Sequence, residues 1–437
     1  MKKAITKLVA ITLIPSLLLV GCLSDSSGES KEENSEMVEL TFWRNSGTDV
    51  ENKVYEDLVT SFEEEHPNID VKMTPIPFAD YSTKLRTALA SGNPPDVFAV
   101  DSPDLAAYAQ AGALKSINKE VTEEADIEDF PDTTLEGLTY KDEIYALPIV
   151  QSGIAMFYNK NLFEEAGIES PPKDPNNPWT WEQVLDASKK LDALSESVYG
   201  IDPGQGFSDG EGPSYFKTPI IWQFGGEILS PDNTTANEYL NSKESLEALQ
   251  FYKDLYHKHK VAAMELPPDP FATGKLGISI NGSWVLSHYK NNFPDFKLDE
   301  DYGIAPLPKE DKQVSPNGGW ALGISSKTEV SDEAWEFVNY LTSKEGQIKY
   351  VQATGDIPVR YSVAEEISEL NEYPMNIFVT QLQEYSKNRP VTPAYPAVSK
   401  SIRKLFEEVG LLGREVGPAA EQAVKDIDKA IQKEIGK

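Results

Sequence analysis

The sequence predicts an α/β fold of two domains, in which a mostly parallel sheet carries helices on both faces. Segments with the two-residue repeat of a strand alternate along the chain with segments that have the repeat of a helix. Such alternation is typical of parallel strands joined by crossover helices. The chain has 437 residues, which is more than one hydrophobic core usually organises.

The first strand is expected where Val38, Leu40 and Phe42 share one side of the chain. Apolar residues then recur at four-residue spacing through residues 50–62, as on the buried face of a helix. A His-Pro-Asn sequence at residues 66–68 is a signal for the end of this helix.

The same alternation continues to residue 112. Residues 69–73 alternate as a second strand, and residues 81–90 predict a helix that ends at a glycine and two prolines. Residues 97–100 form a short apolar run that suits a buried strand. A Ser-Pro pair at residues 102–103 then suits the N-cap and the first position of another helix.

Strands and helices resume later in the chain. Strands are expected at residues 154–158 and 276–280, and residues 169–178 form a loop rich in proline and asparagine. Thr180 and Gln183 have the spacing of a capping box at a helix start. Further helices are expected at residues 159–167, 242–260, 331–341 and from 399 onward, with a break near 410–418.

The N-terminus has the pattern of an export signal. Three lysines precede an uncharged apolar run over residues 8–20, which is too short to span a bilayer as a helix. The run ends at Cys22, the one cysteine of the chain, in a Leu-Val-Gly-Cys sequence that resembles a bacterial lipobox. We expect residues 1–21 to be removed, Cys22 to carry acyl chains, and the polar residues 22–35 to form a flexible tether. An ordinary secretory signal with an incidental cysteine is the alternative.

Charge and hydropathy narrow the range of partners. The formal net charge is −31, and a chain so acidic repels the phosphates of nucleic acids and anionic lipid headgroups. After residue 22, no apolar stretch approaches 18 residues, so we expect membrane attachment through the lipid anchor alone. These observations exclude a nucleic-acid-binding function.

Sequence motifs for catalysis are missing. The chain lacks a Gly-x-Ser-x-Gly elbow, a His-Glu-x-x-His zinc sequence and a phosphate-binding loop. His257 and His259 are two residues apart on a predicted helix and therefore face different sides. Asp299 and Asp301 lack the other ligand positions of a calcium loop. We therefore expect no cofactor and no metal site, while a catalytic pair among the 71 acidic residues stays open at this point.

Four aromatic residues stand beside glycine or proline rather than in helical stripes: Trp222, Trp284, Trp320 and Tyr395. An aromatic side chain in such a turn is well placed to line a cleft formed by strand ends and loops. Its flat face can stack on the C–H face of a sugar ring while nearby polar groups bind the hydroxyls. Packing within the core is the alternative for each of them.

The chain resembles the family 1 extracellular solute-binding proteins, whose best-known member binds maltose and maltodextrins. The resemblance covers nearly all residues from Val38 to the C-terminus, and it depends on the order and spacing of many short segments rather than on any one of them. The segments are LTFWRNSG, FEEEHPNIDVKM, LASGNPPDVFAVD, YAQAGALKSI, YALPI, MFYNKNLFEEAGI, TWEQ, IIWQFGGE, FATGKLGISINGSW, YGIAPLP, GGWALGIS and GDIPVR.

The resemblance implies a two-lobe fold like that of the type II periplasmic binding proteins. Each lobe would be a mostly parallel sheet flanked by helices, and crossing hinge strands would join the lobes near Pro148, residues 320–324 and Pro358. The implied division is residues 36–147 with 321–357 for the first lobe, and 148–320 with 358–437 for the second.

A ligand site between the lobes is implied as well. The matching positions are Ser46, Gly47, Tyr81 and Asp101 from the first lobe, and Tyr158, Trp284, Gly319, Trp320 and Tyr395 from the second. Arg360 follows a crossing and is near enough in sequence to reach the site, and Trp222 joins the set because of its aromatic context.

The family's function implies capture of a solute and its delivery to an ABC permease. We expect a monomeric protein, anchored to the outer face of the cytoplasmic membrane, that closes its lobes on a sugar or oligosaccharide. Aromatic residues also cage quaternary ammonium groups, so a betaine, a polyamine or a peptide is an alternative ligand. An anchored extracellular glycosidase, with two carboxylates across the cleft, is the alternative from another class.

Overall fold

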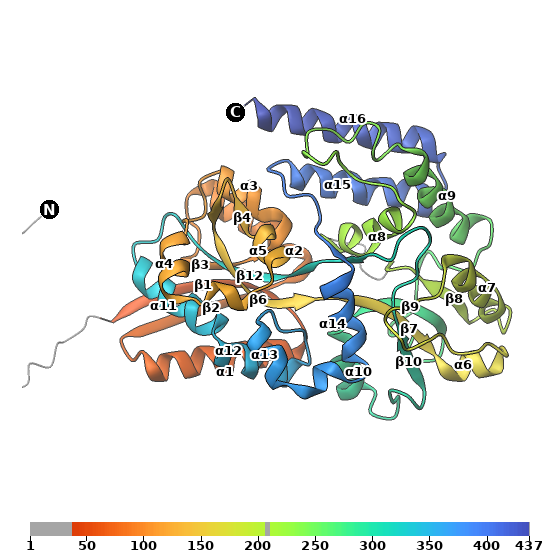
Figure 1. The fold of residues 1–437 in the computed structure, drawn as a ribbon, viewed down its shortest axis with the longest axis horizontal. Coiled ribbons are helices and arrows are strands. Elements are labelled where there is room, and N and C mark those ends of the chain that lie inside the picture. The colour runs from red at the N-terminus through yellow and green to blue at the C-terminus, as the bar shows by residue number, and fades with distance from the viewer. Residues whose placement is uncertain (1–36, 206–209, 437) are drawn as a thin grey trace, which may run out of the picture. The chain divides into compact units, whose positions relative to one another are not determined.

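Two β-sheets organise the residues that the structure describes, which are 37–205 and 210–436 (Figure 1). The structure is a computed structural model. The expected signal sequence, the acylated Cys22 and the tether lie outside the described residues. The remainder, Met37–Lys437, forms one unit by its internal contacts.

The first sheet has five strands in the spatial order β2-β1-β3-β12-β6. Four of these strands run in one direction, because β1 pairs in parallel with β2 and with β3. The reversed strand is β12, which is antiparallel to both β3 and β6. The strands are β1 (Val38–Ser46), β2 (Ile69–Pro77), β3 (Val97–Asp101), β6 (Ala146–Ser152) and β12 (Gly318–Ile324).

The second sheet has four strands in the order β10-β7-β9-β8. It also contains one reversed strand, because β7 is antiparallel to its two neighbours while β8 and β9 are parallel. The strands are β7 (Ile154–Asn159), β8 (Tyr199–Asp202), β9 (Leu276–Gly282) and β10 (Tyr302–Ala305). The predicted fold of two mostly parallel sheets is confirmed, and a reversed strand within each sheet is the feature that periodicity did not indicate.

Helices pack on the first sheet through large apolar side chains. Phe42 of β1 contacts Phe337, with ring centroids 5.2 Å apart, and Phe337 lies 5.1 Å from Phe62. We call the first sheet with its helices the first lobe. Its helices are α1 (Asp49–Glu65), α2 (Phe78–Ser91), α3 (Leu105–Gln110), α4 (Asn118–Glu124), α5 (Asp132–Gly137), α11 (Ser331–Thr342) and α12 (Lys344–Thr354).

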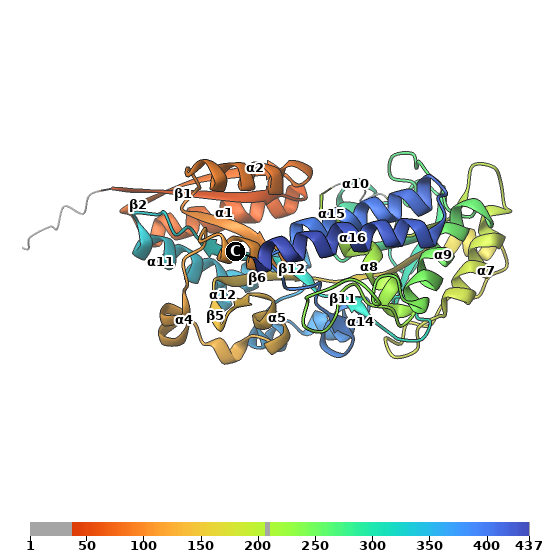
Figure 2. The ribbon, with the colours of Figure 1, turned by 90° about the horizontal axis from the view of Figure 1, so that it is seen from above.

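The second sheet is covered on both faces. One apolar cluster joins it to α7, α8, α9, α15 and α16, and another joins it to α10 and α14. We call this assembly the second lobe. Its helices are α6 (Lys160–Glu165), α7 (Trp181–Asp192), α8 (Gly212–Gln223), α9 (Lys243–His257), α10 (Val285–Asn292), α14 (Met375–Glu384), α15 (Tyr395–Phe406) and α16 (Val416–Ile435). Figure 2 shows α15 and α16 side by side along this lobe, where they contact each other.

The chain passes between the lobes at three places. Gly153 alone separates β6 of the first sheet from β7 of the second. A second crossing leads from β10 to β12 through the short strand β11 (Ser315–Pro316), which pairs with β13 (Ser386–Lys387). The third crossing lies between α12 and α13 (Tyr361–Glu366). Here the Gln151 amide of β6 donates a hydrogen bond to the Ile357 carbonyl oxygen at 3.0 Å. The expected lobe boundaries at residues 147/148 and 320/321 fall inside β6 and β12, both strands of the first sheet.

Local sequence signals agree with the structure where periodicity is strong. The expected strands at 69–73, 97–100, 154–158 and 276–280 lie within β2, β3, β7 and β9. The capping box at Thr180 and Gln183 forms at the start of α7, and α15 and α16 are separated by residues 407–415. A short β-ribbon, β4 (Thr139–Tyr140) with β5 (Glu143–Ile144), was not expected.

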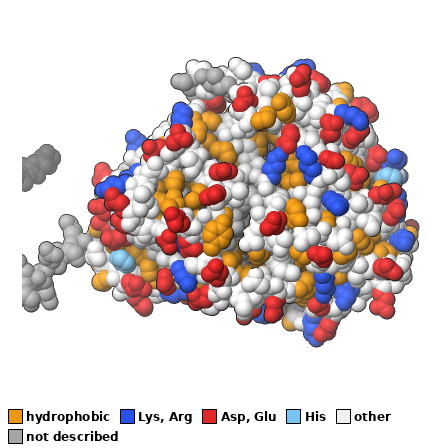
Figure 3. All heavy atoms as spheres, in the orientation of Figure 1, with side chains coloured by type: hydrophobic (Ala, Val, Ile, Leu, Met, Phe, Trp, Pro, Cys, Tyr) orange, Lys and Arg blue, Asp and Glu red, His pale blue; other side chains and the backbone are white. Residues whose placement is uncertain are grey.

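Charged side chains of both signs are interspersed on the face seen in Figure 3. Among the described residues, no helix combines the length and the hydropathy needed to cross a bilayer.

Candidate functional site

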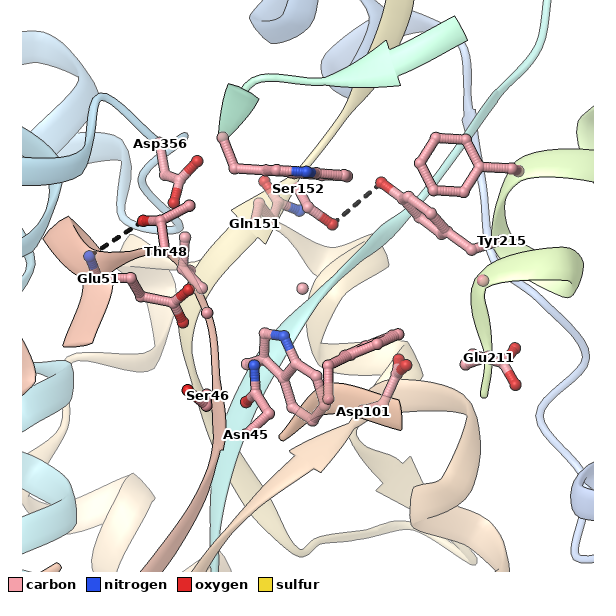
Figure 4. Close-up of a pocket in the computed structure, with 18 of the residues that line it drawn as sticks. Asn45, Ser46, Thr48, Glu51, Asp101, Gln151, Ser152, Glu211, Tyr215 and Asp356 are labelled. Carbon is pink, nitrogen blue, oxygen red and sulfur yellow. Dashed lines mark hydrogen bonds between the residues drawn. The ribbon is translucent and has the colours of Figure 1, made fainter. Parts of the chain in front are cut away.

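A pocket of about 350 Å³ lies where strands of the first sheet end and the second lobe begins (Figure 4). This volume is within the range of small-molecule sites. β1 and β3 end at the pocket, β6 ends there at Ser152, and the reversed strand β12 begins there with Gly319 and Trp320. Ligands of open α/β sheets bind at such carboxyl ends of strands.

The start of α1 forms one side of the pocket. The Thr48 hydroxyl accepts a hydrogen bond from the Glu51 amide at 3.2 Å and so caps the helix. Gly47 precedes the cap, and a β-carbon there would lie 1.3 Å from Glu51 Oε2. A residue without a side chain therefore lets Glu51 fold back toward the pocket, on the same side as Asp356 (Figure 4).

Aromatic side chains line the pocket from both lobes. On the first lobe, Trp320 is half-buried and lies 6.4 Å from Phe78, itself 38 % exposed. On the second lobe, Trp284 is half-buried and lies 6.4 Å from Tyr215 and 6.2 Å from Phe216. The Tyr215 hydroxyl also meets the Ser152 hydroxyl at 3.0 Å across the pocket (Figure 4). The pocket thus presents ring surfaces from two sides and polar groups between them.

A buried arginine stands between two carboxylates at one end of the pocket. Arg389 Nη2 donates to Asp101 Oδ1 at 2.9 Å, and Nη1 donates to Glu211 Oε1 at 2.7 Å. Glu211 also accepts hydrogen bonds from the hydroxyls of Tyr395 and Ser399. Burial raises the pKa of Glu211 to about 7, against the opposing effect of Arg389. Arg389 Nε has no hydrogen-bond partner within the described part of the chain.

A second pair of carboxylates, Glu51 and Asp356, lies at the other end. Burial, followed by the charge of Glu51, raises the pKa of Asp356 to about 7. The Ser283 hydroxyl donates to Asp356 Oδ1 at 3.2 Å and so links the second lobe to the third crossing. Burial also raises the pKa of Glu51, although Arg44 stands 3.5 Å away and acts in the opposite direction.

The raised pKa of Asp356 predicts a pH-dependent effect of Asp356→Asn. Between the unfolded-state pKa of about 3.9 and about 7, the folded chain holds a proton that the unfolded chain has released. This carboxyl therefore lowers the free energy of unfolding as pH rises through that window. We expect the stability of the variant relative to wild type to increase from pH 4 to pH 7, as measured by urea unfolding.

Asp232→Asn is the matched control for this measurement. Hydrogen bonds from Ser230 and Thr234 lower the pKa of Asp232, so its contribution to stability is lost only as pH falls below the unfolded-state pKa of about 3.9. The difference in stability between Asp232→Asn and wild type is therefore expected to change little from about pH 5 to pH 7. A pH-independent difference between Asp356→Asn and wild type would contradict the raised pKa of Asp356.

Six of the eleven expected site residues line the pocket. They are Ser46, Gly47, Asp101, Trp284, Gly319 and Trp320. Two others stand directly behind the lining. Tyr81 is buried, donates to the Ala99 carbonyl at 2.6 Å and lies 5.7 Å from the Trp320 ring. Tyr395 is buried and donates to Glu211.

The remaining three lie elsewhere. Tyr158 is buried in the core of the second lobe, 5.2 Å from Phe163, because its position in β7 points it toward the helices. Trp222 is buried in α8, an element with no exposed face. Arg360 is buried in an ion pair with Asp129 at 3.2 Å. The structure brings none of these three to the pocket.

Sequence reasoning missed fourteen lining residues. They are Asn45, Thr48, Glu51, Phe78, Val150, Gln151, Ser152, Glu211, Gly212, Tyr215, Phe216 and Tyr350, together with the charged Asp356 and Arg389. Signals existed for some of them. Asp356 lies in the GDIPVR segment, and Arg389 begins the proline-rich segment from which Tyr395 was chosen. Tyr215 and Phe216 gave no signal, because α8 is buried on all sides and its polar residues, such as Lys217, do not mark an exposed face.

No group of three or more side chains that could hold a metal ion occurs among residues 37–205 and 210–436.

Comparison with known proteins gives a consistent result. Residues 45–348 match the family described as "Bacterial extracellular solute-binding protein". A putative binding protein of Brucella abortus is 25% identical over 392 residues, covering 87% of this chain and 90% of the relative. The maltotriose-binding protein of Pyrococcus abyssi is 25% identical over 379 residues, covering 85% and 77%. The structure of an ABC transporter solute-binding protein of Thermotoga lettingae, bound with α-D-tagatose, superposes with a TM-score of 0.80 at 27% identity, covering 90% and 100%.

Proposed function

This chain belongs to the bacterial extracellular solute-binding proteins, and we propose that it captures a sugar or oligosaccharide in the pocket between its lobes for delivery to an ABC permease. The observation that carries the proposal is the placement of two half-buried indoles, Trp320 and Trp284, on opposite lobes of one pocket. Ring faces of this kind stack on the C–H faces of a sugar. The relative named for maltotriose and the neighbour bound with tagatose support the same ligand class.

The polar lining suits hydroxyl groups. Asn45, Ser46 and Gln151 offer neutral donors and acceptors, and Glu51 offers carboxylate oxygens. Because the pocket is lined from both lobes, with Trp320 on the first and Trp284 on the second, a ligand that bridges them favours the closed arrangement through contacts that the open one lacks.

A thermal-shift screen tests the proposal. The panel contains mono- and oligosaccharides, betaines, polyamines and short peptides, each at concentrations up to the millimolar range. A ligand at one hundred times its Kd stabilises the folded protein by about 2.7 kcal/mol, so a carbohydrate is expected to raise the melting temperature by several degrees. Stabilisation by a betaine, polyamine or peptide alone would contradict the proposed ligand class.

We propose further that the protein does no chemistry on its ligand. The family and the compared relatives are binding proteins, and Asp101 and Glu211 are both engaged by Arg389. Incubation of the bound carbohydrate with the protein is expected to return it unchanged. Release of a shortened sugar would support the glycosidase alternative.

We also propose that the mature protein is a monomer, anchored by acyl chains on Cys22 to the outer face of the cytoplasmic membrane. The support is the sequence alone: a basic start, an apolar run and Leu-Val-Gly-Cys. Replacing Cys22 with alanine is expected to move the protein from the detergent-rich to the aqueous phase in detergent partitioning, because two acyl chains supply the membrane affinity. Wild-type protein is the control, and a variant that stays in the detergent-rich phase would contradict the anchor.

A further inference from the structure

The ion pairs of Arg389 reach across the pocket. Asp101 and Glu211, its two partners, lie on different lobes, at 2.9 Å and 2.7 Å from the guanidinium. The Arg389 side chain is 3 % exposed, and each carboxylate is 15 % exposed. One side chain therefore connects the lobes through charges that are largely removed from water.

Arg389 is held mainly by the second lobe. Glu211 directly precedes α8 and is fixed by the hydroxyls of Tyr395 and Ser399 on α15. The guanidinium also lies over the ring of Tyr215, with the carbon 5.1 Å from the ring centroid. These contacts are internal to the second lobe and do not depend on how the lobes are arranged.

Asp101 is the partner from the first lobe. It is the last residue of β3, and it pairs in register with Trp320 of β12. Its position is therefore set by the first sheet rather than by Arg389. If the lobes separate, Asp101 moves away with the first sheet while Arg389 stays with Glu211.

The bridge is buried, so its removal has a larger consequence than the loss of a surface ion pair. A buried pair is screened little by salt, and removing Arg389 would leave both carboxylates without their shared counter-ion. Burial raises the pKa of Asp101 and Arg389 acts in the opposite direction, so Arg389 offsets the cost of enclosing this carboxylate when the pocket closes. Opening the pocket breaks the Asp101 half of the bridge, so the bridge favours the closed arrangement.

We propose that Arg389 is an interlobe latch: its pairs with Asp101 and Glu211 hold the pocket closed and set the balance between closed and open lobes. The inference rests on the proposed function only in that lobe closure serves ligand capture, and the bridge acts on the lobes whether or not ligand is present.

Ligand-free protein tests the latch. The mature chain with Cys22→Ser receives Lys72→Cys on the first lobe and Lys189→Cys on the second, two positions with exposed side chains. Spin labels at both sites report the distance between the lobes by double electron–electron resonance. In this background Arg389→Gln is expected to lower the ratio of closed to open protein by about tenfold or more, because it leaves Asp101 and Glu211 enclosed without a counter-ion.

Arg414→Gln is the matched control. It makes the same change in an exposed arginine that pairs with Glu408 inside the second lobe, so its distance distribution is expected to match wild type. A distribution for Arg389→Gln that equals wild type would overturn the latch. The distance measurement contains no ligand, so a result that contradicts the latch leaves the proposed function unaffected. In the same way, a screen in which no carbohydrate binds leaves the result for the latch valid.

Discussion

Replacing Trp320 with alanine is expected to lower carbohydrate affinity by tenfold or more, which corresponds to about 1.4 kcal/mol. Trp320 is half-buried at the start of β12 and is held at right angles by Phe78 and Tyr81, at interplanar angles of 89° and 84°. A ring fixed in this way loses little entropy when a sugar stacks on it. Trp284→Ala on the opposite lobe is expected to act in the same direction. Titration calorimetry with the carbohydrate found in the screen gives the affinities.

Trp179→Ala is the matched control for these variants. Trp179 is also half-buried, but it stacks on Phe163 with ring centroids 6.2 Å apart and does not line the pocket. Replacing Trp179 is expected to change the carbohydrate affinity by less than about twofold, which is the small effect usual for a substitution away from the feature measured. Unchanged affinity in both the Trp320 and Trp284 variants would contradict the site.

The second large effect is expected at Gly319. Its φ of +140° is a conformation that residues with a side chain rarely adopt, and a β-carbon there would lie 2.1 Å from the Val150 carbonyl oxygen. The obstacle is the backbone of β6, which cannot rotate away as a side chain can. Gly319→Ala is therefore expected to lower the free energy of unfolding by about 3 kcal/mol, as measured by urea unfolding.

Gly355→Ala separates the steric part of this effect from the conformational part. Gly355 also has a positive φ, +73°, but a β-carbon there would meet nothing within 4 Å. The left-handed conformation alone costs about 1–2 kcal/mol. A loss at Gly319 no greater than the loss at Gly355 would show that β6 and β12 are not packed as described.

Sequence periodicity was sufficient for elements that bury one face. The repeat of α1 and the alternation of β1 follow directly from contact with the core on one side. Periodicity was insufficient for α8, whose residues are all buried, since an element without an exposed face has no alternation of apolar and polar sides to detect. The reversed strand β12 was also beyond local signals, because strand direction depends on distant partners.

The candidate site could be predicted from the sequence only where its residues follow elements with a clear repeat. Ser46 and Asp101 follow predicted strands, so their place at the sheet edge could be inferred. Tyr395 was chosen for its neighbouring prolines, yet it supports Glu211 instead of lining the pocket. Arg389 was missed because its role depends on Asp101, 288 positions away in the chain.

A crystal structure of the protein with the carbohydrate selected by the screen tests the central claim most directly. We expect the sugar between the two sheets, with one ring against the Trp320 indole and another face against Trp284. Carbohydrate density at any other place, with this pocket empty or filled by solvent, would contradict the account.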